Sequence, residues 1–294
     1  MITPQEKTDP RVAPRRFSAW RVWLFRRIES ALVLLGGRGL YRRTWLRAGR
    51  FRMREEEVRV AGLPAELDGF TVAQLTDLHA GPFLGEGDLA EVVAAVNALE
   101  PEVIAITGDF VAHHWSEAEL IRTDLAGLQA KHGVYAVFGN HDYKDRCEDR
   151  IEAAYQDSGV HFLRNASARL AVGNAHVAIV GVEDLEEARV IDLDAARTDL
   201  VEEDVEIVLC HNPMGARTIA RPGCAAILSG HTHGWQVDLP WLRTLGPQHP
   251  GLRVEFGPTT LLVSRGLGVV GVPLRYKAPA EVVLLKLTRA EPAT

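Results

Sequence analysis

Five short apolar runs, each followed directly by a polar cluster, constrain the fold of this chain more than any other feature of its sequence. The runs are five or six residues long and rich in Val, Ile, Leu, Ala and Phe, and they cover residues 70–75, 103–107, 134–138, 205–210 and 224–228. Short buried strands separated by longer helical stretches are typical of a layered α/β domain. We expect helices over residues 88–99 and 145–157 and antiparallel hairpins after residue 235.

Composition indicates an ordinary folded protein with a substantial core. The chain has 294 residues, of which 47% are hydrophobic and 24% charged, so a disordered or fibrous chain is excluded. The three cysteines, Cys147, Cys210 and Cys224, include no CxxC pair. Such a sparse, odd set excludes a disulfide scaffold and favours a reducing compartment, so we expect a cytoplasmic protein.

The N-terminal part of the chain is strongly basic. Residues 11–54 contain thirteen arginines and one acidic residue, Glu29, which gives this segment a net charge of +12 and leaves −18 for the rest. Apolar residues recur among the arginines at the spacing of one helical face: Phe17, Trp20, Leu24, Ile28, Ala31 and Leu35. Charges interrupt every window long enough to span a bilayer, so we expect a helix lying on an anionic membrane surface.

This pattern predicts three parts: a basic amphipathic leader over residues 1–57 at the inner face of the cell membrane, one domain over residues 58–288, and a tail over residues 289–294. The alternative for the leader is a helix packed on its own globule with arginines in water. Nucleic acid is disfavoured as a partner, because no base-reading module accompanies the arginines and the acidic body would repel a duplex.

The polar clusters supply candidate metal ligands. They read Asp77-Leu78-His79, Gly108-Asp109, Gly139-Asn140-His141-Asp142, Cys210-His211-Asn212 and Gly230-His231-Thr232-His233. Ligands bind beyond the carboxyl ends of strands in α/β sheets, so these side chains can converge there. Oxygen and nitrogen donors without thiolate suit manganese, iron or zinc, and Asp109 is our candidate to bridge two ions.

Together these blocks resemble the calcineurin-like metallophosphoesterase superfamily, whose pattern runs D-x-H, G-D, G-N-H-[DE], H and G-H-x-H; the resemblance covers residues 68–288. The stretches GHTHGW and VSRGLG are similar to its YkuE-like, membrane-associated branch. The resemblance implies a four-layer α-β-β-α sandwich of two mixed sheets, preceded here by the basic helix. It also implies two divalent ions, one held by Asp77, His79, Asp109 and His233, the other by Asp109, Asn140, His211 and His231.

A mechanism follows from this resemblance. A metal-bridged hydroxide would attack phosphorus, and His141, beside the ligand Asn140, would orient the phosphate or protonate the leaving group, with Asp142 steering the imidazole. We therefore take His141 and Asn140 as catalytic. Related protein phosphatases carry G-D-x-x-D-R-G, whereas here Gly108-Asp109 continues as Phe-Val-Ala-His-His, which disfavours a protein substrate.

The resulting hypothesis is a dinuclear phosphohydrolase of the phosphodiesterase or pyrophosphatase type, with manganese as the first choice of metal and iron or zinc as alternatives. The leader favours a lipid-linked phosphate ester as substrate, such as UDP-2,3-diacylglucosamine or a phospholipid. One alternative is a soluble phosphodiesterase acting on small or cyclic-nucleotide esters. An alternative of another class is a non-catalytic scaffold stabilised by metal. His113, His114, Trp235 and Arg265 receive no assigned role.

Overall fold

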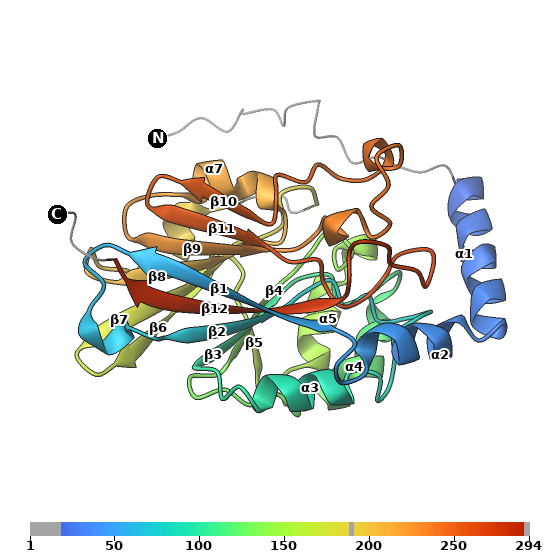
Figure 1. The fold of residues 1–294 in the computed structure, drawn as a ribbon, viewed down its shortest axis with the longest axis horizontal. Coiled ribbons are helices and arrows are strands. Elements are labelled where there is room, and N and C mark those ends of the chain that lie inside the picture. Colours follow the sequence, from blue (N-terminus) through green and yellow to red (C-terminus); the bar gives the residue numbers. More distant parts are fainter. Residues whose placement is uncertain (1–18, 188–190, 291–294) are drawn as a thin grey trace.

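Two six-stranded sheets pack face to face in the computed structural model, which describes residues 19–187 and 191–290 (Figure 1). The first sheet has the order β1 (Arg52–Val60), β12 (Glu281–Arg289), β2 (Thr71–Leu75), β3 (Val103–Thr107), β4 (Val134–Val137) and β5 (Val160–Phe162). Its neighbouring strands are parallel except for the antiparallel pair β12 and β2. The sheet is therefore mixed.

The second sheet is also mixed. Its order is β10 (Arg253–Phe256), β11 (Thr259–Val263), β9 (Cys224–Ser229), β8 (Val205–Leu209), β7 (Ala175–Gly181) and β6 (Ala166–Val172). The four central strands run parallel, and the two edge strands β10 and β6 pair antiparallel with their neighbours. Parallel strands buried on both faces explain why β8 and β9 are apolar except for the buried Glu206 and Ser229.

Helices cover the outer face of each sheet. On the first sheet lie α3 (Ala90–Asn97), α4 (Glu119–Leu125) and α5 (Glu148–Ala154), and on the second the short α6 (Leu193–Ala196) and α7 (Ala216–Ile219). A separate apolar core fills the space between the sheets. The short 3-10 turns are η3 (Ala65–Leu67), η4 (Trp115–Ala118), η5 (Lys144–Arg146), η6 (Pro213–Gly215), η7 (His233–Trp235) and η8 (Arg243–Leu245). These layers confirm the predicted α-β-β-α sandwich.

The five apolar runs all form strands, each ending within a residue of the predicted end. The helices are shorter than predicted at both ends: α3 runs from Ala90 to Asn97, and α5 begins at Glu148, after the 3-10 turn η5, and ends at Ala154. The region after residue 235 does contain a hairpin, β10 with β11. The final strand, β12, instead inserts between β1 and β2 of the first sheet, where its Val283 and Leu285 enter the core between the sheets.

The N-terminal segment divides into an exposed helix and a part built into the domain. In α1 (Ala19–Leu34), Trp20, Trp23 and Phe25 are more than half exposed, whereas Glu29 is buried. The predicted apolar stripe of this helix therefore does not pack on the body, and its first member, Phe17, lies outside the described residues. Within the described ranges, none of the helices is long and apolar enough to cross a bilayer.

Beyond α1 the chain belongs to the fold, so the domain boundary differs from the one predicted at residue 57. The α2 helix (Gly37–Tyr41) and the π-helical turn η2 (Arg42–Leu46) bring Tyr41 and Leu46 into the core beside the first sheet. The strand β1 then pairs with β12 along its whole length, across residue 57. At the other end, β12 runs one residue past the predicted end of the domain, and residues 291–294 of the predicted tail lie outside the described part.

This division predicts that replacing two neighbouring leucines by alanine lowers the free energy of unfolding by unequal amounts. Leu46 is 1% exposed and Leu40 is 62% exposed. We expect Leu46→Ala to lower the free energy of unfolding by about 2–5 kcal/mol, because it leaves a cavity in the core. Leu40→Ala, the matched control, should stay within about 0.5 kcal/mol of the wild type. Urea unfolding followed by circular dichroism measures both, and equal values would contradict the placement of residues 41–46 in the core.

Candidate metal centre

All seven predicted ligands lie at one end of the sandwich. Asp77 and His79 follow β2, Asp109 follows β3 and Asn140 follows β4, while His211 follows β8 and both His231 and His233 follow β9. Because these strands are parallel within each sheet, their carboxyl ends share an edge. The face-to-face packing of the sheets then brings the two edges together.

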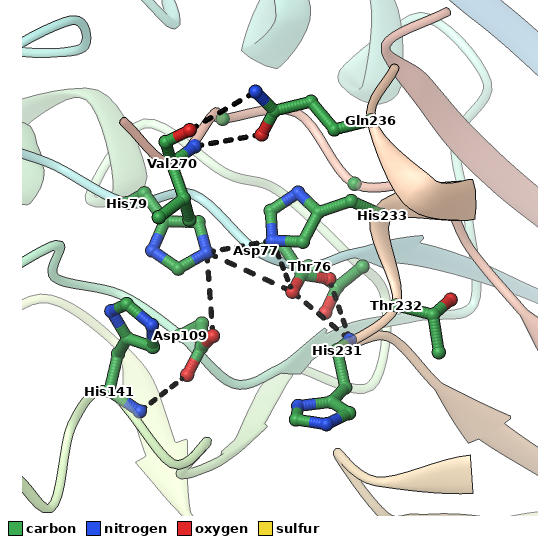
Figure 2. Close-up of polar contacts among 12 residues, drawn as sticks. Thr76, Asp77, His79, Asp109, His141, His231, Thr232, His233, Gln236 and Val270 are labelled. Carbon is green, nitrogen blue, oxygen red and sulfur yellow. Dashed lines mark hydrogen bonds and ion pairs between the residues drawn. The ribbon is translucent and has the colours of Figure 1, made fainter. Parts of the chain in front are cut away.

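Four of these side chains form a buried cluster. One ligand atom each from Asp77, His79, Asp109 and His233 lies within 4.8 Å of the others. The Nε2 atoms of His79 and His233 are 3.0 Å apart, and Asp77 Oδ1 lies 3.3 Å from His233 Nε2 (Figure 2). Asp109 Oδ2 lies 3.4 Å from His79 Nε2. This cluster matches the first predicted metal site.

The second predicted set lies on the other side of Asp109. Asn140 Oδ1 is 2.9 Å from His231 Nδ1 and 3.3 Å from His211 Nε2. The same Asp109 Oδ2 that faces His79 lies 3.4 Å from His211 Nε2. The other oxygen, Oδ1, accepts a hydrogen bond from the backbone amide of His141. Asp109 Oδ2 therefore stands between the two sets, as a bridging ligand must.

The backbone is strained at most of the ligands. Five of the seven have positive φ, an unusual conformation for residues with a Cβ: Asp77 (50°), His79 (46°), Asp109 (56°), His231 (68°) and His233 (50°). Such residues cost on the order of 1–3 kcal/mol each and gather at functional sites. The loops also approach closely, since a Cβ on Gly139 would lie 2.3 Å from Asp109 Oδ1 and one on Gly230 2.3 Å from Asp77 Oδ2.

Burial sets the charge of the first cluster. The pKa of Asp77 is raised to about 6, mainly by burial and also by the neighbouring carboxylate Asp109, while nearby imidazoles oppose the shift. Burial lowers the pKa of His79 and of His233 well below 6.5, so both rings are neutral at neutral pH. Two neutral imidazoles and two carboxyl groups therefore share a volume closed to water.

The second set contains a strong charge pair. Burial opposes ionisation of Asp109, but the imidazoles of His211 and His141 hold the pKa of this carboxyl well below 3.8. Burial likewise opposes the protonation of His211, yet Asp109 raises the pKa of that imidazole well above 6.5. Asp109 is therefore a carboxylate at neutral pH, and a cation would have to displace the proton of His211 to bind there.

The donor set fits divalent metal ions. Within the described residues, the Nδ1 atoms of His79 and His233 have no hydrogen-bond partner, and their Nε2 atoms face each other and two carboxylate oxygens. Facing nitrogen lone pairs in a dry volume are stabilised by a shared cation. Carboxylate oxygen, amide oxygen and imidazole nitrogen suit manganese, iron or zinc.

A further layer of contacts orients the histidines of the second set. His211 donates from Nδ1–H to the carbonyl of Thr107 at 2.7 Å, so loss of its Nε2 proton would turn that nitrogen toward a metal. Glu186 Oε1 lies 3.3 Å from His231 Nε2 and 3.1 Å from the side-chain nitrogen of Asn212. A carboxylate behind a ligand histidine fixes its orientation and basicity.

Glu186 was missed by the sequence reasoning because the strand before it was missed. Residues 175–181 form β7, another apolar run followed by a polar cluster, here Glu183-Asp184. Since β7 is parallel to β8, its carboxyl end reaches the same edge as His211. The run-plus-cluster pattern that identified the other strand ends would have found this one.

His141 lies beside both metal sets. Its ring meets His79 edge to face, with centroids 4.6 Å apart, and burial lowers its pKa to about 4. Its Nδ1 lies 2.8 Å from the carbonyl oxygen of Ala112 and 2.6 Å from Lys144 Nζ. Because a carbonyl oxygen only accepts, Nδ1 carries the proton and donates to Ala112, which leaves Nε2 to meet a substrate.

The predicted partnership of Asp142 with His141 is not what the carboxylate does. Its two oxygens accept hydrogen bonds from four backbone amides, those of Asp109, Phe110, Val111 and Gly139, at 2.8–3.2 Å. The physical reason is that Asp142 lies where the loops after β3 and β4 meet, and their amides have no other acceptor in a strand or helix. Asp142 therefore positions Asp109 rather than the imidazole.

The residues without an assigned role lie around the centre. His113 Nε2 is 2.7 Å from Glu29 Oε2 of α1, and His114 caps η4 through its side chain. Arg265 pairs with the buried Glu281, and Trp235 lies under the guanidinium of Arg243. Each of these side chains is engaged within the protein.

The fold and the buried Asp and His cluster are those of a metallophosphoesterase domain. A family model described as calcineurin-like phosphoesterase matches residues 70–235. The chain belongs to this family, as the ordered motifs implied.

We compare this chain with two relatives and one solved structure to which it is similar. The transmembrane protein with metallophosphoesterase domain from Bos taurus is 32% identical over 254 residues, which are 80% of this chain and 56% of that protein. The metallophosphoesterase YkuE of Bacillus subtilis is 27% identical, with 88% of this chain and 92% of YkuE covered. The NAD nucleotidase of Haemophilus influenzae has 14% identity and a TM-score of 0.47, over 68% of this chain and 45% of its own. The chain thus spans only about half the length of the Bos taurus protein, whereas it spans most of YkuE.

The position of Asp109 predicts the effect of removing its charge. We expect Asp109→Asn to reduce bound metal from a pair of ions to at most a single ion, because both sets lose the carboxylate between them. Asp157→Asn changes an exposed acid and is the matched control, which should keep the wild-type metal content. Elemental analysis after dialysis measures both, and full loading of Asp109→Asn would remove the bridging role.

The place of His141 beside the ligands predicts that its removal lowers turnover without lowering metal content. We expect His141→Ala to retain its metal but to lower kcat by about a hundredfold to ten-thousandfold, the usual contribution of a proton donor. The exposed His161 offers the control, since His161→Ala should leave kcat near the wild-type value. A chromogenic phosphodiester with Mn²⁺ provides the assay. Near wild-type turnover by His141→Ala would rule out its catalytic role.

Proposed function

We propose that this chain hydrolyses a lipid-linked phosphate ester or pyrophosphate at the inner, cytoplasmic surface of the cell membrane. UDP-2,3-diacylglucosamine and phospholipids are the candidate substrates, and manganese is the first candidate for both metal positions. The proposal joins a metal centre able to cleave phosphate esters to a segment suited to a lipid surface.

The position of α1 carries the proposal. This helix stands at the end of the sandwich toward which β2, β8 and β9 point (Figure 1). The pairing of Glu29 with His113, four residues after Asp109, ties it to the loop of the bridging ligand. Exposed tryptophan and arginine side chains together suit the boundary between headgroups and acyl chains. A helix of this kind beside the centre would hold the site at the headgroup layer.

The residues of the centre have separate roles in the proposed reaction. When bound, a pair of divalent ions lowers the pKa of water and balances charge on phosphoryl oxygens. Asn140 contributes its side-chain oxygen between His211 and His231. His141, held through Nδ1, presents Nε2 to hold or deliver a proton at a phosphate oxygen or leaving group. Burial of Asp77 and His79 excludes water from the first set.

Two other functions remain as outcomes of the test. A phosphodiesterase acting on small or cyclic-nucleotide esters would use the same centre without the leader. A metal-stabilised scaffold is disfavoured, because a scaffold has no need of His141 beside a complete set of ligands.

The experiment compares substrates and surfaces. The Mn²⁺-loaded protein is assayed on a lipid diphosphate ester and on a water-soluble phosphodiester, each with vesicles of phosphatidylglycerol and phosphatidylcholine or of phosphatidylcholine alone. We expect the lipid ester to be cleaved at least about tenfold faster on the anionic vesicles, because binding concentrates enzyme and substrate on one surface. A preference for the soluble ester regardless of vesicles would favour the small-ester function, and inactivity on all substrates would favour the scaffold.

A further inference from the structure

A second exposed apolar element lies between β11 and β12, far from the leader in sequence. In residues 270–276, hereafter the apolar loop, Val272, Leu274 and Tyr276 are 38%, 54% and 47% exposed. They alternate with the less exposed Pro273 and Arg275. Two tight turns shape the segment. The amide of Val272 donates to the carbonyl of Val270 at 2.9 Å, and the amide of Leu274 donates to the carbonyl of Val272 at 2.8 Å. The loop therefore presents three apolar side chains to the outside.

The apolar loop is held rigidly from within. Arg275, only 3% exposed, donates from Nη1 to the carbonyls of Arg265 and Ala278 at 2.9 and 3.1 Å. Its Nε donates to the hydroxyl of Tyr41, on α2, at 3.0 Å. A buried guanidinium satisfied by backbone carbonyls fixes the chain on both sides. The exposure of Leu274 and Tyr276 is thus built into the fold.

The apolar loop is also attached to the metal centre. Gln236, three residues after the ligand His233, forms a pair of hydrogen bonds with the backbone of Val270 (Figure 2). The side-chain nitrogen donates to the Val270 carbonyl at 3.1 Å, and the side-chain oxygen accepts from the Val270 amide at 2.8 Å. The amide of Tyr276 donates to the Gln236 carbonyl at 2.9 Å. The loop after β9 thus carries both ligands and the support of the apolar loop.

The leader helix lies against the same loop. A Cβ on Gly271 would stand 2.3 Å from a ring carbon of Phe25 on α1, so the ring rests on the bare glycine. A Cβ on Gly37, just after α1, would stand 3.1 Å from a ring carbon of Pro273. The exposed Trp23 and Phe25 of α1 and the exposed Leu274 of the loop therefore belong to adjoining elements.

We propose that α1 and the apolar loop form one surface that inserts into an anionic membrane leaflet and so holds the metal centre at the headgroups. This inference rests on the proposed function and adds to it the element that fixes the orientation of the site. A single helix can rotate about its axis on a membrane, whereas a helix and a rigid loop define a plane. The Gln236 link then sets where the ligands stand relative to that plane.

Charge favours a bilayer over a second copy of the chain as the occupant. The segment 11–54 carries +12, and a symmetric contact would bring two such segments together. An anionic leaflet attracts the arginines of both segments instead. Arg26 and Arg27 are exposed on α1, and the guanidinium of Arg27 lies 5.3 Å from the ring centre of Trp23. Tryptophan with arginine is typical of the membrane interface.

The test changes the apolar loop and leaves α1 intact. The full chain, its Leu274→Asp variant and a Val201→Asp control are sedimented with vesicles of phosphatidylglycerol and phosphatidylcholine. Val201 is 49% exposed, which is similar to the 54% of Leu274, but it lies in the segment between α6 and β8. We expect Leu274→Asp to weaken vesicle binding about tenfold or more, because it removes an exposed leucine that would insert into the bilayer and adds a negative charge that anionic lipid repels. Thermal unfolding and metal content check that each variant is folded.

Each outcome either supports or overturns the proposal that α1 and the apolar loop form one membrane-inserting surface. Weaker binding by Leu274→Asp with unchanged binding by Val201→Asp supports it, whereas equal binding by all three proteins overturns it. A wild type that forms a dimer in sedimentation velocity, while Leu274→Asp is monomeric and neither binds vesicles, would assign the surface to a second copy and also overturn it. If the loop is needed for vesicle binding but the lipid ester is cleaved no faster than the soluble one, the proposed function fails and this inference stands.

Discussion

The metal centre depends on the four backbone amides that Asp142 collects from two loops. Three of them follow β3, around Asp109, and the fourth belongs to Gly139, just before Asn140. Burial and the neighbouring Asp109 raise the pKa of Asp142 to about 7. A typical hydrogen bond contributes about 0.5–1.5 kcal/mol net, so four such bonds to one side chain tie the two loops together. The amide of His141 then holds Asp109 Oδ1, which leaves Oδ2 to face both histidine sets. The bridging position follows from backbone hydrogen bonding.

The packing of the two sheets holds the ligand residues in the strained backbone conformations that their convergence requires. Five ligands have positive φ, and the glycines beside them allow contacts that no Cβ would permit. The apolar core between the sheets holds these loops in place because it fixes the strand ends from which they emerge. The same packing removes water from Asp77 and His79, whose charged forms are then disfavoured. A cation that neutralises the carboxylates offsets both the strain and the burial.

The sequence allowed the ligands to be predicted better than their surroundings. Ligands such as Asp77 and His231 follow strands readable as apolar runs, and parallel strands end together, so their convergence is a consequence of the fold class. The hydrogen bonds that Asp142 accepts from four backbone amides were not predictable, because they depend on where those amides point in the folded chain. The boundary at residue 57 was misplaced since β1 finds its partner in β12, and pairing between distant segments leaves no local pattern. The exposure of the apolar loop was not predictable either, because it depends on how the folded chain leaves Leu274 and Tyr276 uncovered.

The pairing of β1 with β12 also bears on how the chain is made. Ribosomes release the N-terminal part first, while the strand that completes its edge of the sheet is synthesised near the end. Until then Tyr41, Leu46 and Phe51 lack the neighbours that β12 and the segment before it provide, so a nascent chain carries an unfinished apolar edge. The N-terminal segment therefore joins the first sheet only after β12 has been synthesised.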